Sequence, residues 1–252
     1  MKDRLARVLA RFLPRLVPNL VRARHMEPSM LFSVEDDLSQ PSEFLISLSL
    51  QAIRNAIRVR LDDLDARWDE VTSRGVSEPY LRPSRWPGEH YRLLAGLTQA
   101  LKPKLIVEIG TGGGLSTLAM KQHLDKGSKI VTFDIIDWRA GRPFNVLQTR
   151  DFEGGALVQY LDDLSVPATF AKHSELLRHA NLVFLDGPKD GSMERLFLDN
   201  LRTLSFDSKP VVLALDDIRL WNMLGIWRSI SAPKLDLTSF GHYCGTGLVE
   251  WR

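Results

Sequence analysis

The sequence predicts an α/β protein built on a doubly wound, mostly parallel sheet of seven strands. Beyond the first hundred residues, short apolar runs alternate with amphipathic segments, as expected for strands connected by helices. The first apolar run, 104–109, leads into the glycines of 110–114, typical of the tight turn between a buried strand and a helix. Two final strand-like segments, 235–240 and 243–251, are separated by a short connection and predict a closing antiparallel hairpin. These observations together favour a Rossmann-like sheet.

Length and composition bound the broad class. The chain has 252 residues, of which 44% are hydrophobic and 25% charged, so it can bury a large core and has the composition of a globular protein. The single cysteine, Cys244, excludes an internal disulfide and favours a reducing compartment such as the cytoplasm. The sequence contains no apolar run that approaches the ~20 residues of a membrane-spanning helix.

Charge divides the chain unevenly. Residues 1–25 hold seven basic side chains and one acid, a net charge of +6, whereas 26 basic side chains stand against 30 acidic ones in the remainder, a net charge of −4. We therefore expect a basic amphipathic arm at 1–25, an N-terminal helical region at 26–100 and a ligand-binding domain at 101–252. The acidic body excludes nucleic-acid binding by charge. The arm could lie on an anionic membrane, giving a peripheral location, or pack on a partner, on a second copy of the chain or on the protein's own body.

The region between the arm and the first strand predicts helices and loops. An apolar stripe over 42–72 indicates one or two helices, and 88–101 indicates the helix that precedes the first strand. The loop between them, 73–88, suits either the wall of a substrate pocket or a surface linker. The side chains that make this loop polar and aromatic are Tyr80, Arg82, Arg85 and Trp86.

The remaining elements follow as βα units after the first strand. The expected strands are 129–134, 168–172, 181–186 and 210–216, followed by the hairpin. The expected helices are 115–124, 154–164, 174–179, 191–204 and 218–230. Residues 138–150 form a longer polar connection in which Trp138 is a further candidate for the substrate wall.

The glycine segment points to a nucleoside ligand with a positive charge. A dinucleotide site uses the pattern G-x-G-x-x-G, and here Gly110 and Gly112 fit but Leu115 stands at the third glycine position. Glu108 lies two residues before the first glycine, where a carboxylate favours a cationic ligand over a pyrophosphate. S-adenosylmethionine (SAM) carries a sulfonium and an ammonium group. An ordinary strand–helix turn with glycines for packing is the simpler alternative, but four glycines in five residues exceed what a turn requires.

The pattern E-x-G-x-G-G-G resembles motif I of class I SAM-dependent methyltransferases. Asp134 ends the second strand about 20 residues after the glycines, a separation typical of a carboxylate that binds ribose hydroxyls. Ribose is common to SAM and NAD, so Asp134 supports a nucleoside without choosing between them. The residues expected to contact SAM are Glu108, Gly110, Thr111, Gly112, Gly114, Ser116, Asp134 and Asp186.

Acidic residues also end the fourth and fifth strands. Asp186 follows the fourth strand, and Asp216 and Asp217 end the fifth. Ligands of doubly wound sheets bind at the carboxyl ends of the strands, where three unpaired carboxylates would repel one another. A divalent cation such as Mg²⁺ would relieve this repulsion. The simpler alternatives are a turn at Asp186 and a cap on the helix 218–230 from Asp216 or Asp217.

The segments F-L-D-G-P-K-D and L-D-D resemble the metal-binding elements of Mg²⁺-dependent O-methyltransferases of the catechol and macrocin-type sugar groups. The resemblance covers roughly 104–252 and implies Mg²⁺ on Asp186, Asp216 and Asp217, with Lys189 as the base toward the acceptor hydroxyl. Asp217 stands where the catechol group has asparagine, which favours the sugar-modifying branch. Alternative bases are His90, His173 and His242.

The expected function is therefore SAM-dependent, metal-assisted O-methylation of a hydroxyl on a sugar or another small molecule. Two other hypotheses stay open on the sequence: an NAD-type oxidoreductase, and a non-catalytic protein that keeps the fold for interactions. Leu115 and Glu108 argue against the first, and five acids at the expected site argue against the second.

Overall fold

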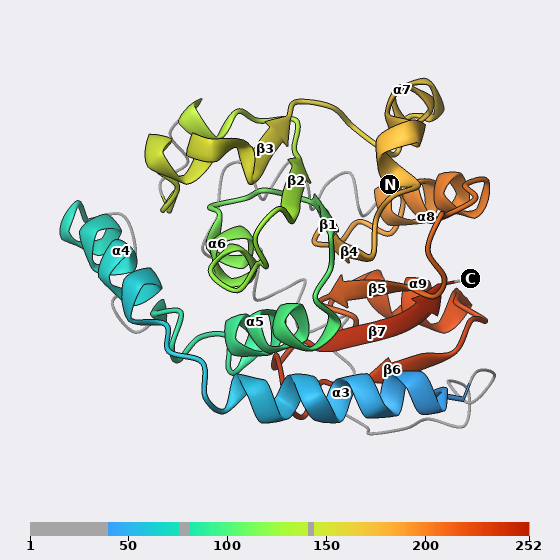
Figure 1. Ribbon diagram of the computed structural model, residues 1–252, viewed down its shortest axis with the longest axis horizontal. Helices are drawn as coiled ribbons and strands as arrows, with labels where there is room; N and C mark the ends of the chain where they lie inside the picture. Colours follow the sequence, from blue (N-terminus) through green and yellow to red (C-terminus); the bar gives the residue numbers. More distant parts are fainter. Residues whose placement is uncertain (1–39, 76–80, 141–143, 252) are drawn as a thin grey trace.

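The computed structural model describes residues 40–75, 81–140 and 144–251, and these form a seven-stranded sheet with helices on both faces (Figure 1). The strand order is β3-β2-β1-β4-β5-β7-β6. The first five strands pair in parallel, and β7 is antiparallel to both β5 and β6, so the predicted fold class and closing hairpin are confirmed. The strands are β1 Leu105–Ile109, β2 Lys129–Phe133, β3 Leu157–Tyr160, β4 Leu182–Leu185, β5 Val211–Asp216, β6 Lys234–Asp236 and β7 Thr246–Trp251.

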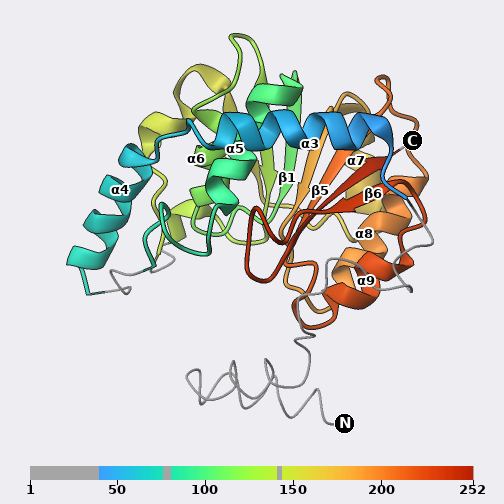
Figure 2. The ribbon, with the colours of Figure 1, turned by 90° about the horizontal axis from the view of Figure 1, so that it is seen from below.

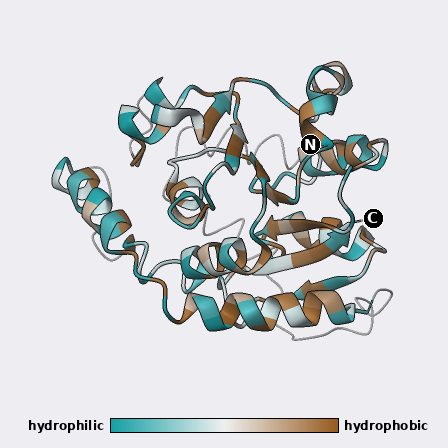
Figure 3. Cartoon of the chain, viewed as in Figure 1, coloured by the Kyte–Doolittle hydropathy of each residue, from teal (hydrophilic) through white to brown (hydrophobic). Residues whose placement is uncertain are grey.

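Each central strand is buried on both faces, which explains its continuous apolar sequence. In β1, Val107 and Ile109 pack into one core, whereas Ile106 points into the other. Glu108 alternates with these residues and is a fully buried carboxylate on a strand that is otherwise apolar. The hydropathy colouring shows the same organisation, with hydrophobic residues along the central strands (Figure 3).

The helices form two layers. Buried residues of α3, α4, α5 and α6 share one core with the sheet, and those of α7, α8 and α9 share the other. In both views α4 lies at the opposite end of the molecule from α8 and α9 (Figures 1 and 2). The helices are α3 Glu43–Ala56, α4 Asp62–Ser73, α5 His90–Leu101, α6 Leu115–Lys121, α7 Pro167–Leu177, α8 Met193–Arg202 and α9 Met223–Ser229, and two 3₁₀ segments are η3 Trp138–Ala140 and η4 Thr149–Gly155.

Two predicted elements between 154 and 172 were wrong, whereas the expected helix 174–179 overlaps the end of α7. The expected helix 154–164 contains β3, which pairs in parallel with β2, and the expected strand 168–172 lies inside α7. The apolar spacing of 154–164 fits a helix, but Gly154 and Gly155 have positive φ and end the preceding turn, after which the chain extends along β2. Pro167 occupies the first turn of α7, a position where its fixed φ favours a helix.

The remaining predictions hold with changed boundaries. The segment 42–72 forms two helices, α3 and α4, and the helix expected from residue 218 begins only at Met223. Within the described residues, no helix is long and apolar enough to cross a membrane. The arm at 1–25, the loop before residue 40 and Tyr80 lie outside the described residues.

Candidate functional site

The parallel strands β1, β2, β4 and β5 end at one edge of the sheet, and the predicted site residues lie along it. At the end of β1 the backbone turns at Gly110, where φ is 96°. A Cβ atom here would lie 2.0 Å from the backbone oxygen of Asp186, the residue that follows β4. Only glycine permits this approach, so Gly110 brings the glycine turn directly against the end of β4.

One side of the glycine turn is open. Gly112 has a φ of 53°, and nothing lies within 4 Å of the position that a Cβ would take. Its N–H donates a hydrogen bond of 3.1 Å to Asp134 Oδ2, across 22 residues of sequence. The other oxygen, Oδ1, accepts from the N–H of Ile136 at 3.0 Å. The structure thus brings the glycines and Asp134 together, and Gly114 stands at the N-cap of α6.

The Thr111 side chain turns into the protein. Its hydroxyl contacts the Thr132 hydroxyl at 2.8 Å and accepts from Gln159 Nε2 at 3.0 Å. Because Thr111 is only 2% exposed, its side chain is committed to holding β1, β2 and β3 together at this edge. A ligand would meet the backbone of the turn here.

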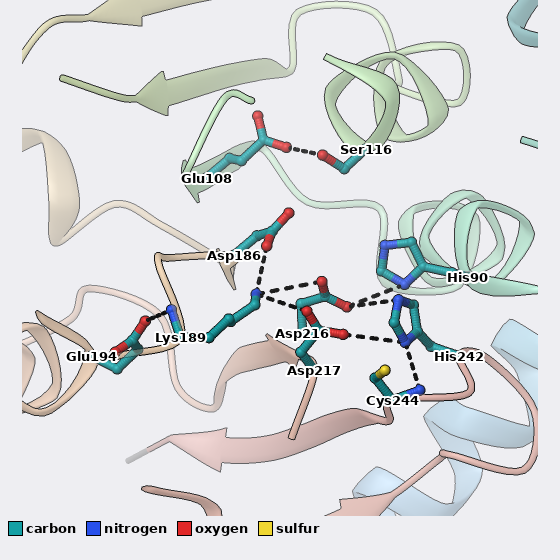
Figure 4. Close-up of polar contacts among 10 residues, drawn as sticks. All are labelled: His90, Glu108, Ser116, Asp186, Lys189, Glu194, Asp216, Asp217, His242 and Cys244. Carbon is teal, nitrogen blue, oxygen red and sulfur yellow. Dashed lines mark hydrogen bonds and ion pairs between the residues drawn. The ribbon is translucent and has the colours of Figure 1, made fainter. Parts of the chain in front are cut away.

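The Glu108 carboxylate is bound by hydroxyl groups at the start of α6. One of its oxygens accepts a hydrogen bond from Ser116 Oγ at 2.7 Å (Figure 4). The other accepts from Thr117 Oγ1 at 2.5 Å, and both donors lie in the first turn of α6. Burial raises the pKa of Glu108 to about 7, although these hydroxyl donors favour the ionised form. Glu108 and Ser116 therefore join the strand to the helix, a role that the sequence did not indicate.

The three predicted metal ligands converge on one side chain of the protein itself. Lys189 Nζ lies 2.5 Å from Asp186 Oδ1, 3.5 Å from Asp216 Oδ2 and 3.7 Å from Asp217 Oδ2. Figure 4 shows the ammonium group pointing between the carboxylates. β4 and β5 are neighbouring strands, so their ends are adjacent, as expected. The buried ammonium group of Lys189 lies among the three carboxylates and reduces their mutual repulsion.

Lys189 is fixed by the backbone around it. It has a φ of 62°, a left-handed conformation that is strained for a residue with a side chain, and Asp217 has the same feature with a φ of 56°. The Lys189 N–H donates a 2.7 Å hydrogen bond to Glu194, a fully buried carboxylate of α8. Burial alone would lower the pKa of Lys189, but the three carboxylates raise it. Its ammonium form is thus favoured, whereas a base must be neutral.

The second oxygens of the aspartate pair face two histidines. Asp216 Oδ1 lies 3.5 Å from His90 Nδ1 and 3.9 Å from His242 Nε2, and Asp217 Oδ1 lies 3.4 Å from His242 Nδ1. Burial lowers the pKa of His90 to about 4 and also lowers that of His242, so both rings are favoured in the neutral form. The sequence identified these histidines only as alternative bases, and no spacing signal places residues 90 and 242 beside Asp216.

The third alternative base lies elsewhere. His173 on α7 contacts Asp162 Oδ2 at 2.7 Å and packs edge-on against Phe133.

The sequence also offered Asp216 or Asp217 as the N-cap of the helix after β5, and this alternative was wrong. That helix, α9, starts at Met223 with Asn222 at its N-cap, several residues after the two aspartates.

The donor set fits a divalent cation. Asp216 Oδ1 and Asp217 Oδ1 are buried and have no hydrogen-bond partner among the described residues. Buried carboxylate oxygens without partners are unfavourable unless a ligand satisfies them. The acids Asp186, Asp216 and Asp217 supply hard oxygen donors, but their arrangement around Lys189 means that a cation must share the cluster with an ammonium group.

Part of the expected substrate wall borders this cluster. The Trp86 ring lies 4.8 Å from that of Tyr243, which in turn stacks on His242 at 5.6 Å. Both aromatic side chains are partly exposed, at 39% and 38%. Trp138 instead stacks on Phe152 at 4.7 Å, and Arg82 forms an ion pair with Asp69. Trp86 is therefore connected to His242 of the cluster through the ring of Tyr243.

Solved structures of similar fold include methyltransferases. TomG, an O-methyltransferase from Streptomyces achromogenes in complex with SAM, aligns with a TM-score of 0.53 and 15% identity over 88% of this chain and 100% of TomG. The SAH-bound methyltransferase PaMTH1 from Podospora anserina aligns with a TM-score of 0.51 and 17% identity over 90% and 100% of the two chains. The chain has the fold of SAM-dependent methyltransferases.

An O-methyltransferase from Bacillus cereus in complex with SAH aligns similarly, with a TM-score of 0.50 and 14% identity over 81% of this chain and 100% of that one. Comparison with protein-family models gives no match. Comparison with curated protein sequences gives none either. The similarity therefore lies in the fold.

Proposed function

We propose that this protein is a SAM-dependent O-methyltransferase that methylates a hydroxyl group of a small molecule, with the help of a divalent cation. One observation carries the proposal: the open glycine turn and the acid–histidine cluster adjoin at the same edge of the sheet. Gly110 touches the backbone of Asp186, whose side chain reaches Lys189 within the cluster. A nucleoside ligand on the turn would thus have its reactive end beside the acids.

The turn supports SAM as the ligand. Gly112 leaves room for close approach of a ligand, and Asp134 offers carboxylate oxygens to ribose hydroxyls beside it. The structures of similar fold include complexes with SAM and SAH. The antiparallel β7 also favours this ligand over NAD, because the dinucleotide-binding sheet continues with a parallel strand.

The cluster supports transfer to an oxygen acceptor. A divalent cation, when bound, lowers the pKa of an acceptor hydroxyl and neutralises charge on the oxygen that forms. Asp216 would help to hold it through its Oδ1 atom, which has no hydrogen-bond partner among the described residues, and Asp186 lies on the side of the SAM site. Lys189 balances the acids and holds Asp186 in place through its 2.5 Å contact, and it could act as a base only after its ammonium proton is lost. Trp86 and Tyr243 offer an aromatic surface on which a sugar ring or an arene could stack.

Calorimetry with SAM and with NAD⁺ tests the proposal. We expect SAM to bind and NAD⁺ to give no heat. Gly112→Ala places a methyl group on the open side of the turn and, with its positive φ, should weaken SAM binding by about tenfold or more while the protein stays folded. Gly127→Ala is the matched control, since Gly127 also has positive φ and open space but lies before β2. Wild-type affinity in Gly112→Ala, or tighter binding of NAD⁺, would contradict the proposal.

A further inference from the structure

The aspartate pair after β5 divides its oxygens between two sides. The Oδ2 atoms of Asp216 and Asp217 face the Lys189 ammonium, and the Oδ1 atoms face His90 and His242 (Figure 4). The lysine side is already occupied by a positive charge. On the histidine side, the described ion-pair contacts of the Oδ1 atoms are with His90 and His242, and no lysine or arginine of the described residues is among them.

The unsatisfied polar atoms collect on the histidine side. Asp216 Oδ1, Asp217 Oδ1 and His90 Nδ1 are buried and lack a hydrogen-bond partner among the described residues. His90 is 3% exposed and Asp216 is 5% exposed, so these atoms are shielded from the bulk solvent. Three such atoms in one place point to a ligand that satisfies them together.

From this geometry we infer that His90, His242 and Asp216 form a binding site for a transition-metal ion, with Asp217 as the residue that orients His242. One donor atom from each of the three ligands lies within 4.8 Å of the other two. Donors that are about 2.0–2.2 Å from a metal ion lie about 3–3.6 Å apart, so the separations of 3.5 and 3.9 Å need only a small contraction.

Asp217 completes the arrangement from the far side of the His242 ring. The N–H of Cys244 donates to His242 Nδ1 at 3.0 Å, which leaves the ring proton on Nε2. Binding of a metal through Nε2 requires the other tautomer, with the proton on Nδ1, and gives up the hydrogen bond from Cys244. Asp217 Oδ1, at 3.4 Å, can then accept that proton in a hydrogen bond, as carboxylates commonly do behind a metal-bound histidine.

The donor set determines which metal is favoured. Imidazole nitrogen suits zinc, iron, cobalt and nickel, whereas Mg²⁺ prefers a shell of oxygen donors. Two imidazoles and one carboxylate therefore select against Mg²⁺, in contrast to the all-carboxylate site expected from the sequence. Three protein ligands also leave coordination positions free, as in catalytic metal sites. Binding of the acceptor hydroxyl at these free positions depends on the proposed function. The inference of the metal site does not depend on it.

Cobalt absorption tests the site without SAM or an acceptor. Full-length protein is first treated with a chelator and then titrated with Co²⁺, and calorimetry compares Mn²⁺, Zn²⁺ and Mg²⁺. We expect a saturable Co²⁺ band, and Mg²⁺ binding more than about tenfold weaker than Zn²⁺ binding. His90→Ala and His242→Ala should each lose the band, whereas His179→Ala, at a half-exposed histidine on the protein surface, should keep it.

Asp186→Asn separates this site from the all-carboxylate one. It should leave Co²⁺ affinity within about threefold of the wild type if the histidines hold the metal, but should abolish binding if the three aspartates do. Wild-type binding in both histidine variants, loss of binding in Asp186→Asn, or equal affinity for Mg²⁺ and Zn²⁺ would overturn the inference.

Imidazole nitrogen spectra of the wild-type protein provide a measurement that does not depend on the folding of variants. On addition of Zn²⁺, two of the six histidines should show metal-bound nitrogens, one of them with its proton moved to Nδ1. Unchanged spectra would equally overturn the inference. SAM calorimetry tests the proposed function, whereas the cobalt and nitrogen spectra test the metal site. The two proposals can therefore fail independently of one another.

Discussion

At the scale of single residues, burial decides what the charged groups at the strand ends can do. Glu108 and Lys189 were both expected to act on ligands, yet each is enclosed by protein groups that satisfy it. Glu108 joins β1 to α6, and Lys189 neutralises neighbouring acids. In each case the sequence placed the residue in or just after a strand but did not show its immediate partners.

The raised pKa of Glu108 makes a prediction about stability. Its pKa is about 7 in the folded protein against an ordinary value of 4.5, so folding favours the protonated acid. As pH rises, Glu108 loses its proton in the unfolded chain before it does so in the folded protein. Its stabilising contribution to the free energy of unfolding is therefore fully present below about pH 4.5 and is lost by about pH 7. Glu108→Gln should remove this loss, which amounts to about 3 kcal/mol at most.

Urea unfolding at about pH 5 and about pH 8 measures the effect. We expect the stability of Glu108→Gln relative to the wild type to be greater at the higher pH. Glu153→Gln is a suitable control, because it makes the same substitution at an exposed glutamate. A constant difference between wild type and Glu108→Gln across this range would contradict the prediction.

The acids of the site could be predicted from the sequence, whereas the histidines could not. Asp134, Asp186 and Asp216 end strands, and strand ends of one parallel sheet share an edge. His90 opens α5, and His242 lies in the loop before β7, so their meeting depends on how a helix and a loop pack over the edge. Strand periodicity carries no information about that packing.

At the scale of elements, α4 supports the segment that covers the glycine turn. Arg67 forms a buried, two-pronged ion pair with Asp151, with distances of 2.7 and 2.9 Å, and also donates to the backbone oxygen of Val146 at 3.1 Å. The Val146 N–H in turn donates to Gly113 at 2.9 Å. A continuous chain of hydrogen bonds thus connects α4 to the turn where SAM is proposed to bind.

Arg67→Met should therefore destabilise the protein and weaken SAM binding. Removal of one partner leaves Asp151 buried without its cation, a loss of about 3–5 kcal/mol in the free energy of unfolding. The nearby Asp63→Asn removes only the exposed partner of Arg67 and should change stability by less than about 1 kcal/mol. Denaturant unfolding and SAM calorimetry measure the two effects, and equal stability of the two variants would argue against this support.

The elements themselves were predicted best where burial is continuous. The strands β1, β2, β4 and β5 are short, mostly apolar runs that are almost entirely buried, as expected for the centre of a parallel sheet. The error at β3 and α7 has a physical origin. β3 is a short edge strand with a partly exposed sequence, so its pairing with β2 outweighs a local spacing that also fits a helix.

At the scale of the whole molecule, charge separates the N-terminal arm from the rest. The segment 1–25 carries +6 and the remainder −4. The arm also has apolar residues at helical spacing, including Leu9, Phe12 and Leu16. A helix over this segment would have one basic and one apolar side. That suits an anionic membrane surface, where each basic residue near the headgroups contributes about 1 kcal/mol of binding, and it suits docking on the protein's own body equally well.

Sedimentation with vesicles tests whether the arm binds membranes. The full chain should sediment with vesicles that contain anionic lipid, less so as salt is raised, and not with vesicles of neutral lipid alone. Removal of 1–25 should abolish sedimentation while SAM affinity stays unchanged. Replacement of Leu9, Phe12 and Leu16 by glutamine keeps the charge and removes the apolar face, so it separates insertion from electrostatic attraction. Equal sedimentation of the full and shortened chains would mean that the acidic body, against its charge, carries the binding.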